Sequence, residues 1–137
     1  MNIDLGRVLE IIKKLEQSEE FKEIQGIAYN KDLGKIDSIK RSKTLGSDTK
    51  YKLVAEMRRS NDITELILQV RKLIEGKEGS YVLEMKYAFQ KADVFIRNFS
   101  LKVEDLLETS FLPIDDICER FKELLKALLG EVTLRMI

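Results

Sequence analysis

The sequence predicts an all-α fold: a compact bundle of five or six helices in a single helical domain that spans residues 1–137. Three observations lead to this prediction. Leu, Ile, Lys and Glu dominate the composition, and these residue types favour helices. Pro occurs once and Gly seven times, which leaves few turn residues for an all-β fold. Apolar residues also recur at helical spacing in several segments of the chain.

The first predicted helix spans about residues 4–25. Its apolar side chains form one broad stripe with Glu and Lys on the opposite side, and Gly26 suits its end. Residues 27–46 follow with no sustained period. They form either a short pair of strands or one long basic loop, and a loop of this length is typical of functional or mobile segments.

Three helices are predicted in the middle of the chain, over residues 48–59, 62–76 and 81–99. Asp62 and Glu65 have the spacing of a capping box at the start of the second of these helices. The third, "YVLEMKYAFQKADVFIRNF", is apolar nearly all round, which predicts the central and most buried helix. We expect Tyr87 to lie in the core there, with a partner for its hydroxyl.

A short helix over residues 100–107 and a longer last helix complete the predicted bundle. Pro113 suits the first turn of the last helix, and Gly130 suits its end. Asp115 and Asp116 lie at its start, where their charge meets the positive end of the helix dipole. The apolar tail "VTLRMI" either adds a strand or docks on a neighbour.

The residue types that are missing exclude most catalytic and metal chemistry. The chain has no His and one Cys, so Cys/His zinc sites and Cys–His or Ser–His nucleophiles are excluded. No phosphate-binding or dinucleotide-binding glycine motif occurs. We therefore expect no enzyme, no cofactor and no metal, although carboxylate-only chemistry such as that of a nuclease stays formally open.

The single cysteine, Cys118, is expected to be a small buried apolar residue, and one cysteine alone cannot form an internal disulfide. This cysteine usage fits a reducing cytosol, so a cytoplasmic location is expected. The longest uncharged apolar runs are far shorter than the roughly 20 residues that a membrane-spanning helix needs. No membrane partner is therefore expected.

Basic residues are concentrated in one part of this chain, although its total formal charge is zero. Residues 31–59 hold nine basic and four acidic residues, whereas both ends of the chain are acidic. Such a segment either contacts the phosphates of a nucleic acid, with Tyr51 stacking on a base, or is an ordinary solvated Lys-rich surface. The residues predicted to bind RNA are Lys40, Arg41, Lys43, Lys50, Lys52, Arg58, Arg59, Arg71, Lys86 and Lys91.

The order of features from about residue 57 to 133 resembles the small helical subunit of type III-A CRISPR effector complexes. The segments that carry the resemblance are "SNDITELILQVRKL", "VLEMKYAFQKADVFI" and "ICERFKELLKALLGEV", with "LKVEDLLETSFLPI" in place of the family's short helix and linker. The resemblance implies a non-catalytic subunit, stacked in several copies along a filament, that holds guide or target RNA with basic side chains.

The preferred prediction is therefore an RNA-contacting structural subunit of a multi-protein ribonucleoprotein that also associates with itself and with other subunits. The alternative is a helical protein–protein interaction module, a viral or plasmid adaptor with no nucleic-acid contact. A DNA-binding regulator is a third possibility, but the chain lacks a recognisable helix-turn-helix spacing in a basic context, and "TKYKLVAEMRRSNDITELI" fits that motif only when the alignment is forced.

Overall fold

Residues 5–28, 38–45, 50–60, 63–90, 94–101 and 114–135 are described by the computed structural model. Its elements are α1 (Leu5–Glu16), α2 (Glu19–Ala28), β1 (Ser38–Thr44), β2 (Tyr51–Ser60), β3 (Ile63–Ile74), β4 (Lys77–Gln90), β5 (Val94–Leu101) and α4 (Ile114–Arg135). The fold is therefore α+β, and the prediction of an all-α bundle in one helical domain is wrong. The three helices predicted in the middle of the chain are strands β2, β3, β4 and β5, and β1 lies within the predicted loop at 27–46.

The five strands form one antiparallel sheet in the order β1-β2-β3-β4-β5, so each strand pairs with its neighbour in the sequence. The strands form because large apolar residues recur at every second position, which places them on one face of an extended chain. In β3, Leu66, Leu68 and Val70 follow this pattern, and all three are fully buried. The same segments also contain apolar residues at helical spacing, in addition to those at every second position. This second pattern is why the sequence predicted helices.

The turn between β3 and β4 explains why Gly76 ends no helix. Glu75 and Gly76 are the only residues of this two-residue loop, and both have positive φ, 52° and 76°. Two consecutive positive φ values are those of a type I′ turn, whose twist matches that of the two strands. Beyond this turn the register shifts between Val70 and Arg71 and again between Arg71 and Leu73.

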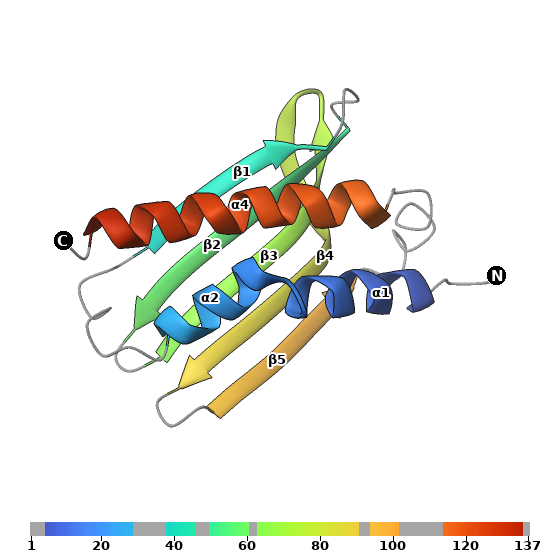
Figure 1. Ribbon diagram of the computed structural model, residues 1–137. Coiled ribbons are helices and arrows are strands. Elements are labelled where there is room, and N and C mark those ends of the chain that lie inside the picture. Colours follow the sequence, from blue (N-terminus) through green and yellow to red (C-terminus); the bar gives the residue numbers. More distant parts are fainter. Residues whose placement is uncertain are drawn as a thin grey trace.

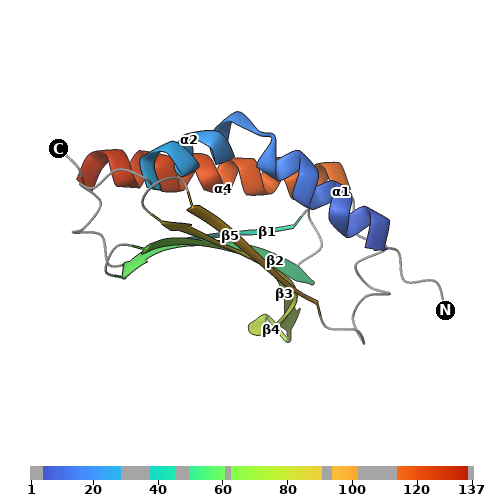
Figure 2. The ribbon, with the colours of Figure 1, turned by 90° about the horizontal axis from the view of Figure 1, so that it is seen from below.

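The molecule has two layers, one of helices and one of sheet. Figure 1 shows α4 crossing β1 and β2, with α1 and α2 lying beside it over the other strands. Figure 2, seen along the layers, shows all three helices on one side of the sheet, while the β3–β4 hairpin projects on the other side. In residue contacts, α4 packs against β1 and β2, and α2 packs against β4.

The core lies between these layers. Phe21 of α2 packs edge-on against Tyr87 of β4, with ring centroids 4.9 Å apart, and lies 6.1 Å from the ring of Phe89. Tyr87 is therefore in the core, as predicted, although on a strand. The helices contribute their apolar stripes, whose buried members are Val8, Ile11, Ile12 and Leu15 of α1, Phe21, Ile24 and Ala28 of α2, and Ile117, Cys118, Phe121, Leu124, Leu125, Leu128 and Val132 of α4.

The predicted N-terminal helix is confirmed as helical but is divided into two. Ser18 lies at the break, where its hydroxyl accepts a hydrogen bond from the amide of Phe21 at 3.2 Å and donates one to the carbonyl of Leu15 at 2.6 Å. The first of these bonds is an N-cap, which satisfies an otherwise unpaired amide at the start of α2. The helix α2 then passes through Gly26 and ends at Ala28.

The predicted C-terminal helix is confirmed, but it extends beyond Gly130 to Arg135. The first residues of the apolar tail are therefore helical and add no strand. Asp115 lies in the first turn, as predicted, and accepts a hydrogen bond from Lys14 Nζ of α1 at 2.9 Å. This hydrogen bond raises the pKa of Lys14.

Candidate interaction surface on the open face of the sheet

One face of the sheet is left uncovered by the helices, and we call it the open face. Its residues alternate along each strand with the residues that face the helices, because successive side chains of a strand point to opposite sides. The strand registers then place these side chains together: Ser38, Lys40, Ser42 and Thr44 of β1, Lys52, Val54, Glu56 and Arg58 of β2, Ile63, Glu65, Ile67, Gln69 and Arg71 of β3, and Glu84, Lys86 and Ala88 of β4.

Two apolar residues occupy the middle of the open face. Val54 is 2% and Ile67 is 7% exposed, yet neither belongs to the cluster of buried residues between sheet and helices. The register sets them diagonally across β2 and β3, since Val54 opposes Gln69 and Ile67 opposes Glu56. Their register partners, Gln69 and Glu56, have long side chains, and the aliphatic stems of such side chains cover apolar surface while their polar ends stay in water.

The structure separates the predicted RNA-binding cations into three groups. Those on the open face are Lys40, Lys52, Arg58, Arg71 and Lys86, which lie on four different strands. Those on the opposite side of the sheet are Arg41, Lys43 and Arg59, while Lys50 lies in the turn before β2. Lys91 lies outside the described residues.

One carboxylate holds two of the open-face cations. Glu65 Oε1 accepts a hydrogen bond from Arg58 Nε at 3.2 Å, and its Oε2 lies 3.3 Å from Lys86 Nζ. These residues come from β2, β3 and β4, so the triad crosses three strands. The prediction that Glu65 belongs to a capping box is wrong, because Glu65 lies in strand β3. Its carboxylate instead neutralises Arg58 and Lys86, two of the cations predicted to bind RNA.

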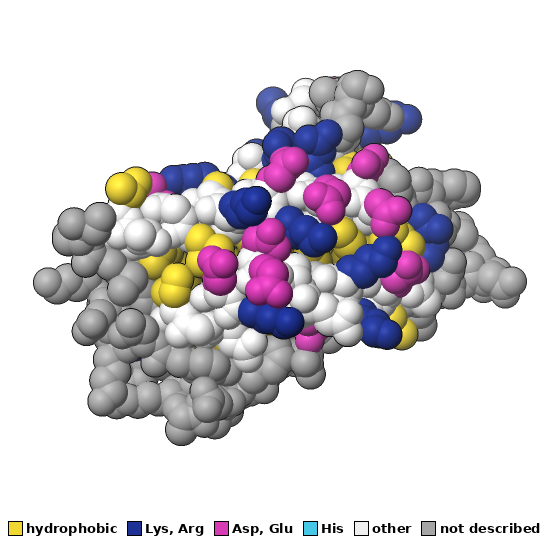
Figure 3. Space-filling view, viewed as in Figure 1, with side chains coloured by type: hydrophobic (Ala, Val, Ile, Leu, Met, Phe, Trp, Pro, Cys, Tyr) yellow, Lys and Arg dark blue, Asp and Glu magenta, His cyan; other side chains and the backbone are white. Residues whose placement is uncertain are grey.

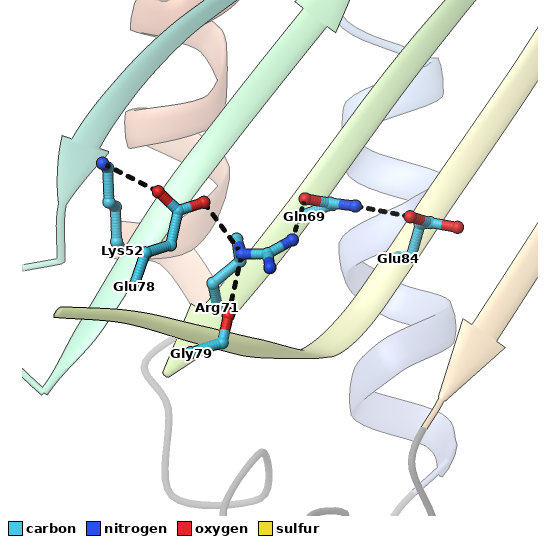
Figure 4. A network of polar contacts seen from close by, with 6 residues as sticks. All are labelled: Lys52, Gln69, Arg71, Glu78, Gly79 and Glu84. Atoms are coloured by element: carbon cyan, nitrogen blue, oxygen red, sulfur yellow. Dashed lines mark hydrogen bonds and ion pairs between the residues drawn. The ribbon is translucent and has the colours of Figure 1, made fainter. Parts of the chain in front are cut away.

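A second polar network holds the base of the β3–β4 hairpin (Figure 4). Arg71 Nε lies 2.9 Å from Glu78 Oε1 and donates to the carbonyl of Gly79 at 3.1 Å, and Arg71 Nη1 donates to Gln69 Oε1 at 2.8 Å. The network continues in both directions. Lys52 Nζ donates to the other oxygen of Glu78 at 3.4 Å, and Gln69 Nε2 donates to Glu84.

The charges on the open face compensate one another. Its five cations share the described surface with four carboxylates, those of Glu56, Glu65, Glu84 and, from the hairpin, Glu78. A phosphate that approached Arg58, Arg71 or Lys86 would also approach the carboxylate bound to that cation, and like charges repel. The open face thus offers charges of both signs at close spacing.

The cations on the opposite side of β1 join the sheet to the helical layer. Arg41 Nη2 lies 3.2 Å from Glu131 Oε2, and Lys43 Nζ donates to Glu123, both acceptors belonging to α4. The hydrogen bond from Lys43 lowers the pKa of Glu123. Figure 3 shows basic and acidic side chains interspersed over the helical layer, so this side also has no large area of one sign among its described residues.

A shallow depression of about 420 Å³ lies next to the β3–β4 hairpin. It is lined by Lys50, Tyr51, Lys72, Leu73 and Ile74. Tyr51, predicted to stack on a base, is only partly exposed and packs against the core. Ile74 is 62% exposed, which gives the depression an apolar wall.

The cysteine and the carboxylates are the other candidate groups of the described chain. Cys118 is buried, as predicted, and its burial raises the pKa of the thiol. Within the described residues no three His, Cys, Asp or Glu side chains are grouped so that they could hold a metal ion. The helices described here include none with the length and apolar character needed to cross a membrane.

No family model matches this chain, and comparisons with curated proteins and with solved structures also find no match. The resemblance seen in the sequence therefore stays a prediction. The helices it implies are wrong for two of its three segments, because "SNDITELILQVRKL" covers β3 and "VLEMKYAFQKADVFI" covers β4 and part of β5. The third segment is helical, in α4.

Sequence reasoning missed the carboxylates that define the open face. The predicted site contained cations alone, whereas Glu65 pairs with Arg58 and Glu78 pairs with Arg71. Glu84 joins the same surface through Gln69, which donates a hydrogen bond to it. The signal that could have found them is the alternation of apolar and polar residues in β3 and β4. Read with a period of two, it places Glu65 and Glu84 on the same face as Lys86 and Arg71.

Proposed function

We propose that this chain is a non-catalytic protein-interaction module that binds another protein with the open face of its sheet. The observation that carries the proposal is the arrangement of that face, on which charges of both signs alternate around Val54 and Ile67. This is the second of the two functions predicted from the sequence, on an α+β fold in place of a helical one.

The charge pattern supports a protein partner. Closely spaced charges of both signs select a partner through the arrangement of its own charges, because wrong juxtapositions bring like charges together. The partner we expect is a folded protein whose surface carries charges of both signs, with a carboxylate opposite Lys40 and a cation opposite Glu56. Val54 and Ile67 are almost fully covered by their neighbours, so the face offers a partner mainly charged and polar groups, and we expect a weak, reversible contact of modest area.

RNA contact is the second candidate function. It is favoured by one observation, the convergence of five predicted cations from four strands on one face. It ranks second because these cations have neighbouring carboxylates, so the release of counterions that drives binding to phosphates would be small. The two candidate functions predict different cross-linked products from the open face: a protein for the interaction module and RNA for the RNA-contacting subunit.

The experiment is site-specific photo-cross-linking in cells that naturally produce the protein. A photo-reactive amino acid replaces Ile63 or Lys40, two exposed residues of the open face. Matched control positions are Leu9 of α1 and Lys126 of α4, which are exposed on the helical layer. Each cross-linked product is treated with ribonuclease before its mass is determined.

A protein cross-linked from both open-face positions, resistant to ribonuclease and absent from the controls, is the expected result. Its yield should fall in a variant that carries Glu56→Lys, which reverses one charge of the face. RNA cross-linked from the open face would replace the proposal with the second candidate. Equal products from the helical positions, or none from the open face, would overturn it.

A further inference from the structure

The two edges of the sheet differ in how well they are protected against pairing with another strand. An edge strand has a row of backbone N–H and C=O groups that face outward, and these can template a further strand. The edges here are β1 and β5, since the strand order is β1-β2-β3-β4-β5.

The β1 edge carries the features that oppose such pairing. Its sequence, SIKRSKT, has three cations in seven residues. Lysine on an edge strand is a common protection, because a second strand must desolvate it or oppose it with another cation. Arg41 and Lys43 are also held by carboxylates of α4, which keeps these long side chains beside the strand.

The β5 edge has a different composition. Its sequence, VFIRNFSL, has one charged residue, Arg97, and neither Pro nor Gly. Its Val, Ile and Phe residues favour extended structure, and such low-charge segments are prone to pair with other strands. It pairs with β4 along its full length without a register shift, so its backbone is regular. Among the described elements, none pairs with its outer edge.

We propose that the outer edge of β5 binds β5 of a second copy of this chain, antiparallel, so that two five-stranded sheets become one continuous sheet. This inference goes beyond the proposed function and does not depend on it. The contact is isologous: the same strand is used by both copies and is related by a two-fold axis.

A second copy is the occupant because this pairing uses the outer edge of β5, with which no described strand pairs, in both copies at once. The paired sheet then ends on each side in β1, the edge that carries three cations. Pairing of β5 with β1 of another copy would instead be head-to-tail and could extend without limit, as heterologous contacts do. It would also bring the cations of β1 against a strand that has no acidic residue.

The first test is the molar mass of the purified full chain in solution, by light scattering after size-exclusion chromatography. The expected mass is twice that of the 15.9 kDa chain. Asn98→Lys gives β5 a central lysine of the kind that β1 carries, and it should convert the dimer to a monomer. Ser42→Lys, the matched change on β1, should leave the dimer intact. A monomeric wild-type chain, or a dimer that persists in Asn98→Lys, would overturn the proposal.

A second test locates the contact and stays informative if Asn98→Lys fails to fold. Single cysteines replace each residue from Phe95 to Ser100 in a Cys118→Ala background, and disulfide formation between copies is measured. Because a two-fold axis brings together only residues near it, cross-linking should peak at one or two central positions and fall on both sides. Cysteines at Ser38, Ser42 and Thr44 of β1 are the controls. A dimer that cross-links at β1, or shows no peak in β5, would contradict the proposed contact.

Discussion

The hydroxyl of Tyr87, whose ring is fully buried in β4, donates a hydrogen bond to Glu16 Oε2 at the end of α1, over 3.3 Å. This bond joins the sheet to the point where the chain turns from α1 into α2. Phe21, just beyond that turn, packs edge-on against the same ring. The Tyr87 side chain thus helps to position the N-terminal helices on the sheet, through one apolar contact and one polar contact.

Removing the Tyr87 hydroxyl should therefore weaken the protein by a modest amount. For Tyr87→Phe we expect the free energy of unfolding to fall by about 0.5–1.5 kcal/mol, the net value of one hydrogen bond, because Glu16 can still turn to water. Urea unfolding of wild type, Tyr87→Phe, Glu16→Ala and the double variant measures the coupling between the two side chains. If Glu16→Ala lowers the free energy of unfolding by the same amount in the Tyr87→Phe background as in the wild type, the hydrogen bond contributes nothing to stability.

The helical ends of the fold could be predicted from sequence, and the sheet could not. In α1, α2 and α4 the apolar stripe at helical spacing is the dominant pattern, and nothing competes with it. The strands have two patterns at once. Leu66, Leu68 and Val70 alternate, but Ile67 and Ile63 fill the intervening positions, so the segment also matches a helix. Ile67 is apolar and buried on the open face, and this departure from strict alternation concealed the strand.

The candidate site could be predicted only in part, because its cations can be found from composition but their partners depend on the strands that the sequence concealed. The cations were identified by composition, which needs no fold, and five of them do lie on one face. Their partners depend on strand register: Glu65 meets Lys86 only because β3 and β4 are antiparallel and meet at this register. The turn at Glu75–Gly76 was the local signal for that pairing, but a Gly after an apolar helical stripe also suits a helix end.

Substitution of a core residue of β3 tests the alternation directly. Leu68 is fully buried between sheet and helices, so Leu68→Ala should lower the free energy of unfolding by about 2–5 kcal/mol through lost burial and the cavity left behind. Ile63, on the same strand and 37% exposed, is the control, and Ile63→Ala should cost less than about 1 kcal/mol. Chemical denaturation gives both values, and similar losses at the two positions would be incompatible with this sheet.

Arg71 should contribute more to stability than the other cations of the open face. Its guanidinium bonds to the Gly79 carbonyl and to Gln69, and pairs with Glu78, so Arg71→Met leaves three partners with fewer bonds. We expect a loss of about 1–3 kcal/mol in the free energy of unfolding, the range for hydrogen bonds to charged groups.

Lys52→Met is the matched control for Arg71→Met, since it removes a cation from the same network. Lys52 has one long contact there, 3.4 Å from Glu78, so its loss should cost less than about 1 kcal/mol. Thermal and urea unfolding of the two variants supply the comparison. If Lys52→Met lowers the free energy of unfolding more than Arg71→Met does, then Arg71 is not the residue that holds the base of the β3–β4 hairpin.

The pairing of Lys43 with Glu123 should make the attachment of α4 to β1 depend on pH. Because the hydrogen bond lowers the pKa of Glu123 in the folded chain, its contribution is present above the unfolded value of about 4.3 and is lost as the pH falls through the folded value. Lys43→Met should therefore lower the melting temperature at neutral pH, and the gap to wild type should close on acidification.

Lys22→Met, at an exposed position of α2, removes the same charge without touching this pair and corrects for the change in net charge. Melting curves of the three proteins from neutral pH to below pH 4, followed by circular dichroism, give the comparison. A gap between Lys43→Met and wild type that widens as the pH falls would mean that the ion pair does not stabilise the folded chain, because protonation of Glu123 can only weaken its attraction to a cation.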